Sequence, residues 1–181
     1  MAIFKKETLA QLNQAQASTA RQYNVLVVDD KDSNLSVMSA ILRNDYHVLE
    51  ARDGQEALAL IESLEDPESL ACIVSDYRMP RLNGVELFEK AQLIAPKTSR
   101  IIVTGFIDID AIVDSINRGG ICKFIVKPFE ASDLLDAVRS AVQSYESYQQ
   151  LLSETHTLQT RNAELEKWLL DKKSIADSPS P

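Results

Sequence analysis

The chain has 181 residues, of which 45% are apolar, and a formal net charge of −8. This length suits one ordinary domain with an extension, and the negative charge gives little electrostatic support to nucleic-acid binding. No apolar run approaches the roughly 20 residues of a membrane span, and the N-terminus lacks the apolar core of a signal peptide. We therefore expect a cytoplasmic protein that binds neither nucleic acid nor membrane.

Residues 1–22 are rich in Gln, Ala and Thr and show only a weak helical pattern of apolar side chains. We interpret them as a segment that is either helical or disordered. The rest of the chain, up to about residue 145, alternates short apolar runs with segments of helical period. This alternation predicts a parallel α/β sheet covered on both faces.

The expected elements follow one another in a regular order. Strands are expected at residues 23–29, 46–51, 70–76, 100–104 and 123–126. Helices are expected after Asp32-Ser33-Asn34, which we interpret as caps, after Asp53-Gly54, before Pro96, over residues 108–117, and from Ala131 onward. Cys72 falls in an expected strand and Cys122 at the start of another, so we predict two small buried residues. Their spacing suggests neither a disulfide framework nor a metal site.

Polar residues close four of the apolar runs. They are Asp29 with Asp30, Asp76, Thr104 and Lys127. The carboxyl ends of parallel strands converge on one crevice, where ligands bind. Clustered carboxylates repel one another and need a cation, and oxygen ligands suit Mg²⁺ or Mn²⁺. Asp76 would then be the nucleophile toward a phosphoryl group, with Thr104 and Lys127 free to hold its oxygens.

Residues 23–145 resemble the receiver domain of two-component response regulators. The motifs that carry the resemblance are Asp29-Asp30, Asp76 with Met79-Pro80 and Gly84, Thr104-Gly105, and Lys127-Pro128-Phe129. Phe124 stands at the aromatic switch position of that family. The resemblance implies a doubly wound, flavodoxin-like sheet of five parallel strands in the order 2-1-3-4-5. It also implies a sensor histidine kinase or a phosphotransfer protein as the partner.

The resemblance also implies a role for each site residue. Asp76 would accept the phosphoryl group, and Asp30, Asp76 and the backbone carbonyl of Arg78 would bind Mg²⁺ or Mn²⁺ directly. Asp29 would act through a bound water and through its charge. Lys127 would pair with the phosphoryl oxygens, after a peptide bond to Pro128 that is cis in the family.

The same resemblance implies a switch and a site that sets the phosphoryl lifetime. Thr104 would move to bond the phosphoryl group, and Phe124 would turn inward behind it. Arg78 and Phe106 would flank the path of the hydrolytic water. Neither side chain is a carboxylate or amide that would orient this water, so we predict slow self-dephosphorylation; the alternative is that both point to solvent and have no effect.

The final helix has no stop signal, since no Gly or Pro occurs from residue 129 through residue 177. A heptad pattern occupies residues 146–173. Its d positions are Leu151, Leu158 and Leu165, and its a positions are Tyr148, Thr155, Asn162 and Leu169. This pattern predicts a parallel homodimeric coiled coil, in which a lone Asn at an a position fixes the register. The alternative is a single helix that packs back on its own receiver, and residues 174–181 are expected to be a disordered tail.

Three functions are compatible with these elements. The first is a switch that is controlled by phosphorylation and signals through the switch face and the dimeric coiled coil. The second is the receiver and coiled coil of a longer regulator, with a cyclic-di-GMP enzyme or a serine phosphatase beyond residue 181. The third, a transcription factor, lacks a DNA-binding module in these residues. We find no second catalytic constellation in the sequence, so we expect no separate enzyme here.

Overall fold

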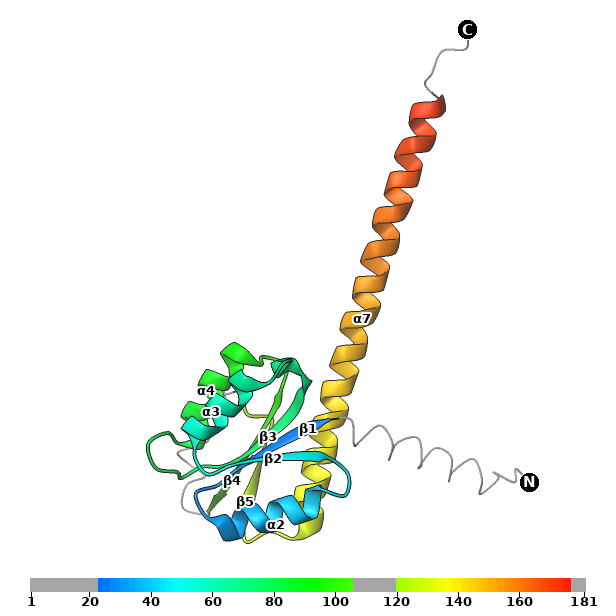
Figure 1. Cartoon of the computed structure of the whole chain (residues 1–181). Helices are drawn as coiled ribbons and strands as arrows, with labels where there is room; N and C mark the ends of the chain where they lie inside the picture. Colours follow the sequence, from blue (N-terminus) through cyan, green and yellow to red (C-terminus); the bar gives the residue numbers. More distant parts are fainter. Residues whose placement is uncertain (1–22, 106–119, 177–181) are drawn as a thin grey trace, which may run out of the picture. The chain divides into compact units, whose positions relative to one another are not determined.

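The computed structural model describes residues 23–105 and 120–176, with side chains through residue 168. Its centre is a sheet of five parallel strands (Figure 1). The strands are β1 (Asn24–Val28), β2 (His47–Ala51), β3 (Leu70–Asp76), β4 (Ser99–Gly105) and β5 (Lys123–Lys127). Their order is β2-β1-β3-β4-β5. The predicted fold class and strand order are confirmed.

In the described ranges, four α-helices and one short 3₁₀ helix accompany the strands. They are α2 (Asp32–Leu42), α3 (Gly54–Ser63), the 3₁₀ helix η1 (Pro67–Ser69), α4 (Gly84–Ile94) and α7 (Ala131–Ala176). The segment 1–22, Phe106, the helix expected over residues 108–117 and the end of the tail, residues 177–181, lie outside the described residues.

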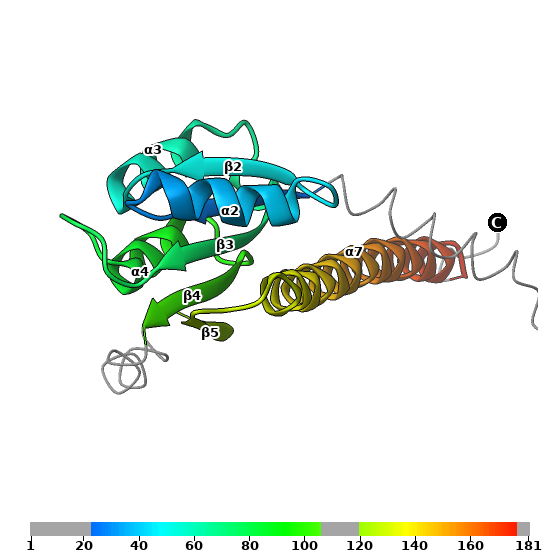
Figure 2. The same ribbon diagram turned by 90° about the horizontal axis from the view of Figure 1, so that it is seen from below.

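Two hydrophobic cores lie on opposite faces of the sheet, because successive strand side chains point to opposite sides. Val25 and Val27 of β1 face the core that is shared with α2 and the first turns of α7. Leu26 and Val28 face the core that is shared with α3 and α4. Figure 1 shows α3 and α4 next to each other on one side of the sheet and α2 on the other side, and in Figure 2, the view from below, α2 lies in front.

Local capping chemistry marks the start of α3 and of α4. The Asp53 carboxylate accepts hydrogen bonds from the first turn of α3, and Asn83 and Glu86 form a reciprocal capping box at α4. The prediction that Asp32-Ser33-Asn34 would cap the first helix was wrong: α2 begins at Asp32, and Lys31 occupies its N-cap without a side-chain cap. The side-chain amide of Asn34, within the first turn of α2, instead donates to the Asp29 carboxylate.

α7 runs without interruption from Ala131 to Ala176. Its first turns belong to a compact unit that ends at Tyr145, and there Leu134, Val138 and Tyr145 are buried against the sheet. The Tyr145 ring packs edge-on against Tyr23, with ring centroids 5.7 Å apart. A second unit begins at Glu146. Along this second unit every described side chain from residue 150 to residue 168 is exposed.

The two cysteines differ in environment. Cys72 is buried in β3, as predicted. Cys122 is exposed, and its thiol donates to the Arg100 carbonyl at 3.1 Å. The prediction for Cys122 was wrong because the residue lies just before β5, which is an edge strand of the sheet. Nowhere in the described ranges is a helix both long and apolar enough to cross a membrane.

Candidate functional site at the carboxyl ends of the strands

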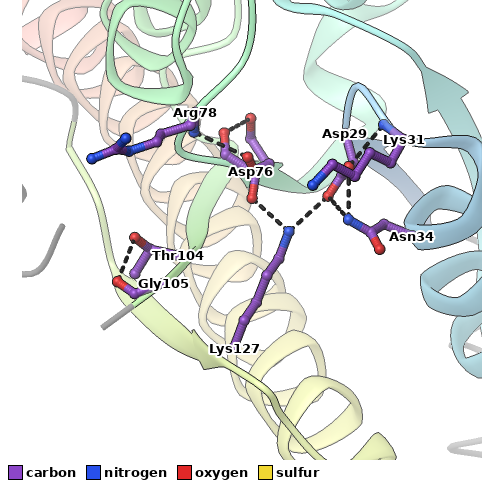
Figure 3. A network of polar contacts seen from close by, with 9 residues as sticks. Asp29, Lys31, Asn34, Asp76, Arg78, Thr104, Gly105 and Lys127 are labelled. Atoms are coloured by element: carbon purple, nitrogen blue, oxygen red, sulfur yellow. Dashed lines mark hydrogen bonds and ion pairs between the residues drawn. The ribbon is translucent and has the colours of Figure 1, made fainter. Parts of the chain in front are cut away.

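Polar side chains from four strands meet at one edge of the sheet (Figure 3). Asp29 follows β1 directly, Asp76 is the last residue of β3, and Lys127 is the last residue of β5. Thr104 is the penultimate residue of β4. Because all the strands are parallel, their carboxyl ends lie at the same edge, and the sequence prediction of one shared site is supported by this arrangement.

The ammonium group of Lys127 lies between two carboxylates. Its Nζ is 2.9 Å from Asp29 Oδ2 and 2.6 Å from Asp76 Oδ1. The Asp29 side chain is fully buried and that of Asp76 is 12% exposed, whereas Lys127 is 30% exposed. Lys127 reaches past β4 to make both contacts, since β4 lies between β3 and β5. One cation thus neutralises two carboxylates that would otherwise repel each other.

Asp29 has further donors from the first turn of α2. Its Oδ1 accepts the backbone N–H of Lys31 at 3.0 Å, and both of its oxygens lie 2.9 Å from the Asn34 side-chain nitrogen. A buried carboxylate requires such partners, because an unpaired charge in a protein interior is costly. This requirement explains why Asn34 does not cap α2. Neither contact was predicted from the sequence.

Asp76 is held by the chain that follows it. Its Oδ2 accepts the backbone N–H of Arg78 at 3.0 Å, while its Oδ1 faces Lys127. A Cβ at Gly84 would lie 2.4 Å from the Asp76 carbonyl oxygen, so only glycine fits at this position. The motif glycine therefore allows α4 to begin directly against the Asp76 backbone.

Burial and charge shift the pKa values of the central pair in the same direction. Burial raises the pKa of Asp76, the nearby Asp29 carboxylate adds to this rise, and the Lys127 ammonium and the Arg78 N–H only partly offset it. Burial lowers the pKa of Lys127, but the hydrogen bonds and charges of Asp76 and Asp29 outweigh this effect and leave it above its usual value. Lys127 is therefore a firmly charged cation at neutral pH.

The two expected switch residues lie on neighbouring strands. Thr104 is buried, and its hydroxyl donates to the Gly105 carbonyl at 3.3 Å. The ring of Phe124 on β5 is 44% exposed, so it faces outward in this structure. The peptide bond between Lys127 and Pro128 is cis, as the resemblance implied.

The oxygen donors at this edge suit a hard divalent cation. The Lys127 ammonium, seated between Asp29 and Asp76, shows that positive charge is accommodated at the point where a cation would be needed. Asp30 is exposed and takes no part in the contacts of Lys127. Among the described residues, no three His, Cys, Asp or Glu side chains are grouped as a metal site. The donor chemistry fits Mg²⁺, and a direct role for Asp30 stays a prediction.

Comparison with known proteins identifies the family. The profile of the "Response regulator receiver domain" family matches residues 25–139. The chain belongs to the response regulator receiver family. A partner histidine kinase follows from this membership, and receivers of this family typically bind Mg²⁺.

Individual relatives of this receiver carry different output functions in their names. The hydrogenase transcriptional regulatory protein HoxA of Cupriavidus necator is 36% identical over 124 residues, which are 68% of this chain and 25% of that protein. A crystal structure named for adenylate cyclase from Rhodopirellula baltica is 31% identical with a TM-score of 0.66, covering 73% of this chain and 98% of that one. A receiver domain protein from Clostridium thermocellum is 28% identical with a TM-score of 0.63, and the match covers 72% of this chain and 98% of that one. The chain spans about a quarter of the length of the HoxA relatives.

Proposed function

We propose that this receiver accepts a phosphoryl group on Asp76 from a histidine kinase or a phosphotransfer protein. One observation carries the proposal: the Asp76 carboxylate is fixed at the end of β3 between the Lys127 ammonium and the Arg78 N–H. A carboxylate oxygen of Asp76 forms a bond to phosphorus as the bond from phosphorus to the donor's imidazole nitrogen breaks. The electron pair of the broken bond returns to that nitrogen.

The remaining residues hold the product. Lys127 transfers its contacts from the carboxylates to the phosphoryl oxygens, and the Thr104 hydroxyl leaves the Gly105 carbonyl to donate to one of them. Asp30, Asp76 and the backbone carbonyl of Arg78 would hold Mg²⁺ or Mn²⁺, while Asp29 would contribute through a water and its charge. The bound cation would act as a Lewis acid that stabilises charge on the phosphoryl oxygens.

A stable analogue tests this site without a kinase. Beryllium fluoride with Mg²⁺ is expected to raise the melting temperature of the wild type, because a ligand that binds only the folded state stabilises it. Asp76→Asn is expected to show no rise, while Asp45→Asn, at a half-buried carboxylate in the turn after α2, serves as the matched control. An equal rise for Asp76→Asn and the wild type contradicts the assignment.

Phosphorylation works as a switch through Thr104 and Phe124. A phosphoryl group adds close to two negative charges and three acceptor oxygens, which bias an equilibrium between two conformations. As Thr104 moves toward the phosphoryl group, it leaves space into which the exposed Phe124 ring turns. ¹⁹F-labelled phenylalanine at position 124 measures this directly, since beryllium fluoride should move its signal toward a buried environment. An unchanged signal upon saturation contradicts the switch.

The phosphoryl lifetime is long because Arg78 and Phe106 do not orient a hydrolytic water. Arg78 lies two residues after the phosphoacceptor, and Phe106 two residues after Thr104. The double substitution Arg78→Asn with Phe106→Glu supplies an amide and a carboxylate at these positions. It is expected to shorten the half-life of the phosphorylated protein, and an unchanged half-life rules out this role.

The stripe of leucines on α7 serves as a parallel homodimer seam. Leu151 and Leu158 are each 61% exposed and Leu165 is 51% exposed in the single chain, so each has apolar surface for a partner helix to cover. Burying one leucine contributes about 1.5–3 kcal/mol before ordering costs. Tyr148, Thr155 and Asn162 occupy the other seam position, whereas the side chain of Leu169 lies outside the described residues. A second copy of the chain is the occupant, because the heptad pattern is self-complementary.

Sedimentation of the wild type and of Leu158→Asp tests the seam. The wild type should be dimeric and Leu158→Asp monomeric, with Asp76 labelling intact in both. Thr157→Asp, off the seam on the same helix, is the matched control and should stay dimeric. A monomeric wild type with and without beryllium fluoride contradicts the dimer and favours a helix that acts alone.

A second candidate function places this chain within a longer regulator. The relatives favour it, since HoxA is about four times as long as the matched region and one matching structure is named for adenylate cyclase. Residues 1–181 would then be the receiver and coiled coil that control a C-terminal output enzyme, such as a cyclic-di-GMP enzyme or a serine phosphatase. Sequencing of the reading frame past Pro181 decides this: an immediate stop codon excludes it.

A further inference from the structure

The loop between β3 and α4, residues 77–83, controls how Asp76 is presented. It carries Arg78, whose N–H binds Asp76 Oδ2. Its two ends close beside Asp76, since the Tyr77 N–H donates to the Val103 carbonyl at 2.9 Å and the Gly84 N–H donates to the Tyr77 carbonyl at 3.0 Å. The far turn, residues 80–82, is held by contacts outside the sheet.

That far turn has a backbone conformation that is unfavourable for its residue. Arg81 has a φ of +69°, which favours glycine. The Leu82 N–H donates to the Pro80 carbonyl at 2.8 Å, which makes a three-residue γ-turn of the rarer, strained hand. Such a conformation persists only where surrounding contacts determine it.

The first such contact is an ion pair with α3. The Arg81 guanidinium donates to Asp53 Oδ2. The other oxygen of Asp53 accepts the N–H groups of Gln55 and Glu56 at 2.8 and 2.9 Å, so this carboxylate is fixed at the start of α3. The hydrogen bond from the Glu56 N–H lowers the pKa of Asp53 by more than burial raises it. The pKa therefore lies below its usual value, and Asp53 is charged at neutral pH.

The second contact is a close approach of backbone and side chain. A Cβ at Gly54 would lie 2.8 Å from Leu82 Cδ2 and 2.9 Å from Leu82 Cβ. Leu82 is buried in the core beneath α3 and α4, which lie next to each other in Figures 1 and 2. Arg81 and Leu82 therefore dock the far turn onto the first turn of α3.

We propose that Arg81 is a positioning residue for phosphoryl acceptance, and that its ion pair with Asp53 holds the loop so that the Arg78 N–H orients the Asp76 carboxylate. This inference rests on the proposed role of Asp76. Without the guanidinium, the turn relaxes toward negative φ, and the loop between Asp76 and α4 shifts with it. Arg78 then loses its fixed place, and both its N–H and its backbone carbonyl become less well oriented for the site.

The test compares Arg81→Gln, Arg81→Lys and Asp53→Asn with the wild type. Asn keeps the acceptor that caps α3, so Asp53→Asn removes the charge and leaves the cap. Arg52→Gln is the matched control, because it breaks an ion pair with Asp32 that is exposed and does not involve the loop. Two quantities are measured: the Mg²⁺ concentration for half-maximal labelling by acetyl phosphate, and the amide hydrogen exchange of residues 77–83 in metal-free protein.

Arg81→Gln and Asp53→Asn are expected to raise the half-saturating Mg²⁺ roughly tenfold, at the low end of the effect of outer contacts on metal sites. The maximal rate at saturating Mg²⁺ should change little, and exchange in the loop should accelerate. Arg81→Lys keeps the positive charge, so its half-saturating Mg²⁺ concentration and its loop exchange should lie close to those of the wild type. The double variant, Arg81→Gln with Asp53→Asn, should differ little from either single variant in these two quantities.

The outcomes separate this inference from the proposed function. A wild type that takes no phosphoryl group overturns both. If the wild type is labelled at Asp76 but Arg81→Gln matches it in Mg²⁺ dependence, the role of Arg81 is overturned and that of Asp76 stands. If Arg81→Gln exchanges faster in the loop but keeps the wild-type Mg²⁺ dependence, the role of Arg81 is also overturned, because the ion pair would then stabilise the fold without affecting the site.

Discussion

Replacing Lys127 by Met is expected to destabilise the metal-free protein, since it leaves the buried Asp29 carboxylate and the nearly buried Asp76 carboxylate without their shared cation. Hydrogen bonds to charged groups contribute about 1.5–3 kcal/mol each. Lys127 makes two of them but is 30% exposed, and both carboxylates keep backbone donors. We therefore expect a loss of about 2–3 kcal/mol, below the ~3–5 kcal/mol typical of a fully buried broken pair.

Urea unfolding in EDTA and in saturating Mg²⁺ measures this difference. Mg²⁺ should narrow the gap between Lys127→Met and the wild type, because a divalent cation replaces the missing positive charge. Arg52→Met is the control: Arg52 and Asp32 are 67% and 76% exposed, and such pairs contribute about 0–1 kcal/mol. If Lys127→Met unfolds at the same urea concentration as this control in EDTA, the assignment of Lys127 as the neutralising cation is refuted.

Three further predictions follow from burial, charge and heptad position. Burial raises the pKa of Asp76 above its usual 3.8. In EDTA, the stability of the wild type relative to Asp76→Asn should therefore be greatest below pH 3.8 and fall as the pH rises through the raised pKa. A stability difference that stays constant from pH 3 to 8 in paired urea titrations would contradict this. Phe88→Ala removes a fully buried ring and should cost about 3–5 kcal/mol of unfolding free energy, whereas Leu93→Ala, 85% exposed on the same helix, should change it by about 0.5 kcal/mol or less. Asn162→Leu should raise the melting temperature of the coiled coil and populate oligomers beyond the dimer, and a purely dimeric variant in sedimentation would count against an Asn-specified register.

Much of the sheet and of its site could be predicted from the sequence, because each strand is a short apolar run and the site residues stand where the runs end. Val25–Val28 and Leu70–Ser75 are long enough to define buried strands, and Asp29 and Asp76 follow them directly. Once the strands are known to be parallel, the meeting of these ends is a matter of geometry.

Contacts between distant segments could not be predicted in the same way. Asn34 looked like a helix cap because caps are recognised locally, but the buried Asp29 carboxylate competes for its amide. Arg81 and Asp53 are 28 residues apart and lie in two loops with no periodic pattern. Only the packing of α3 beside α4 brings them together, and this packing depends on the whole core.

The most direct test of the central claim is the intact mass of the protein after incubation with acetyl phosphate and Mg²⁺. The wild type should gain the mass of one phosphoryl group, lose it on treatment with hydroxylamine, which cleaves acyl phosphates, and show no gain when EDTA is present. Asp76→Asn should keep its original mass, while Asp45→Asn should behave like the wild type. An unchanged wild-type mass, or equal labelling of Asp76→Asn, would contradict the account of Asp76 as the phosphoacceptor.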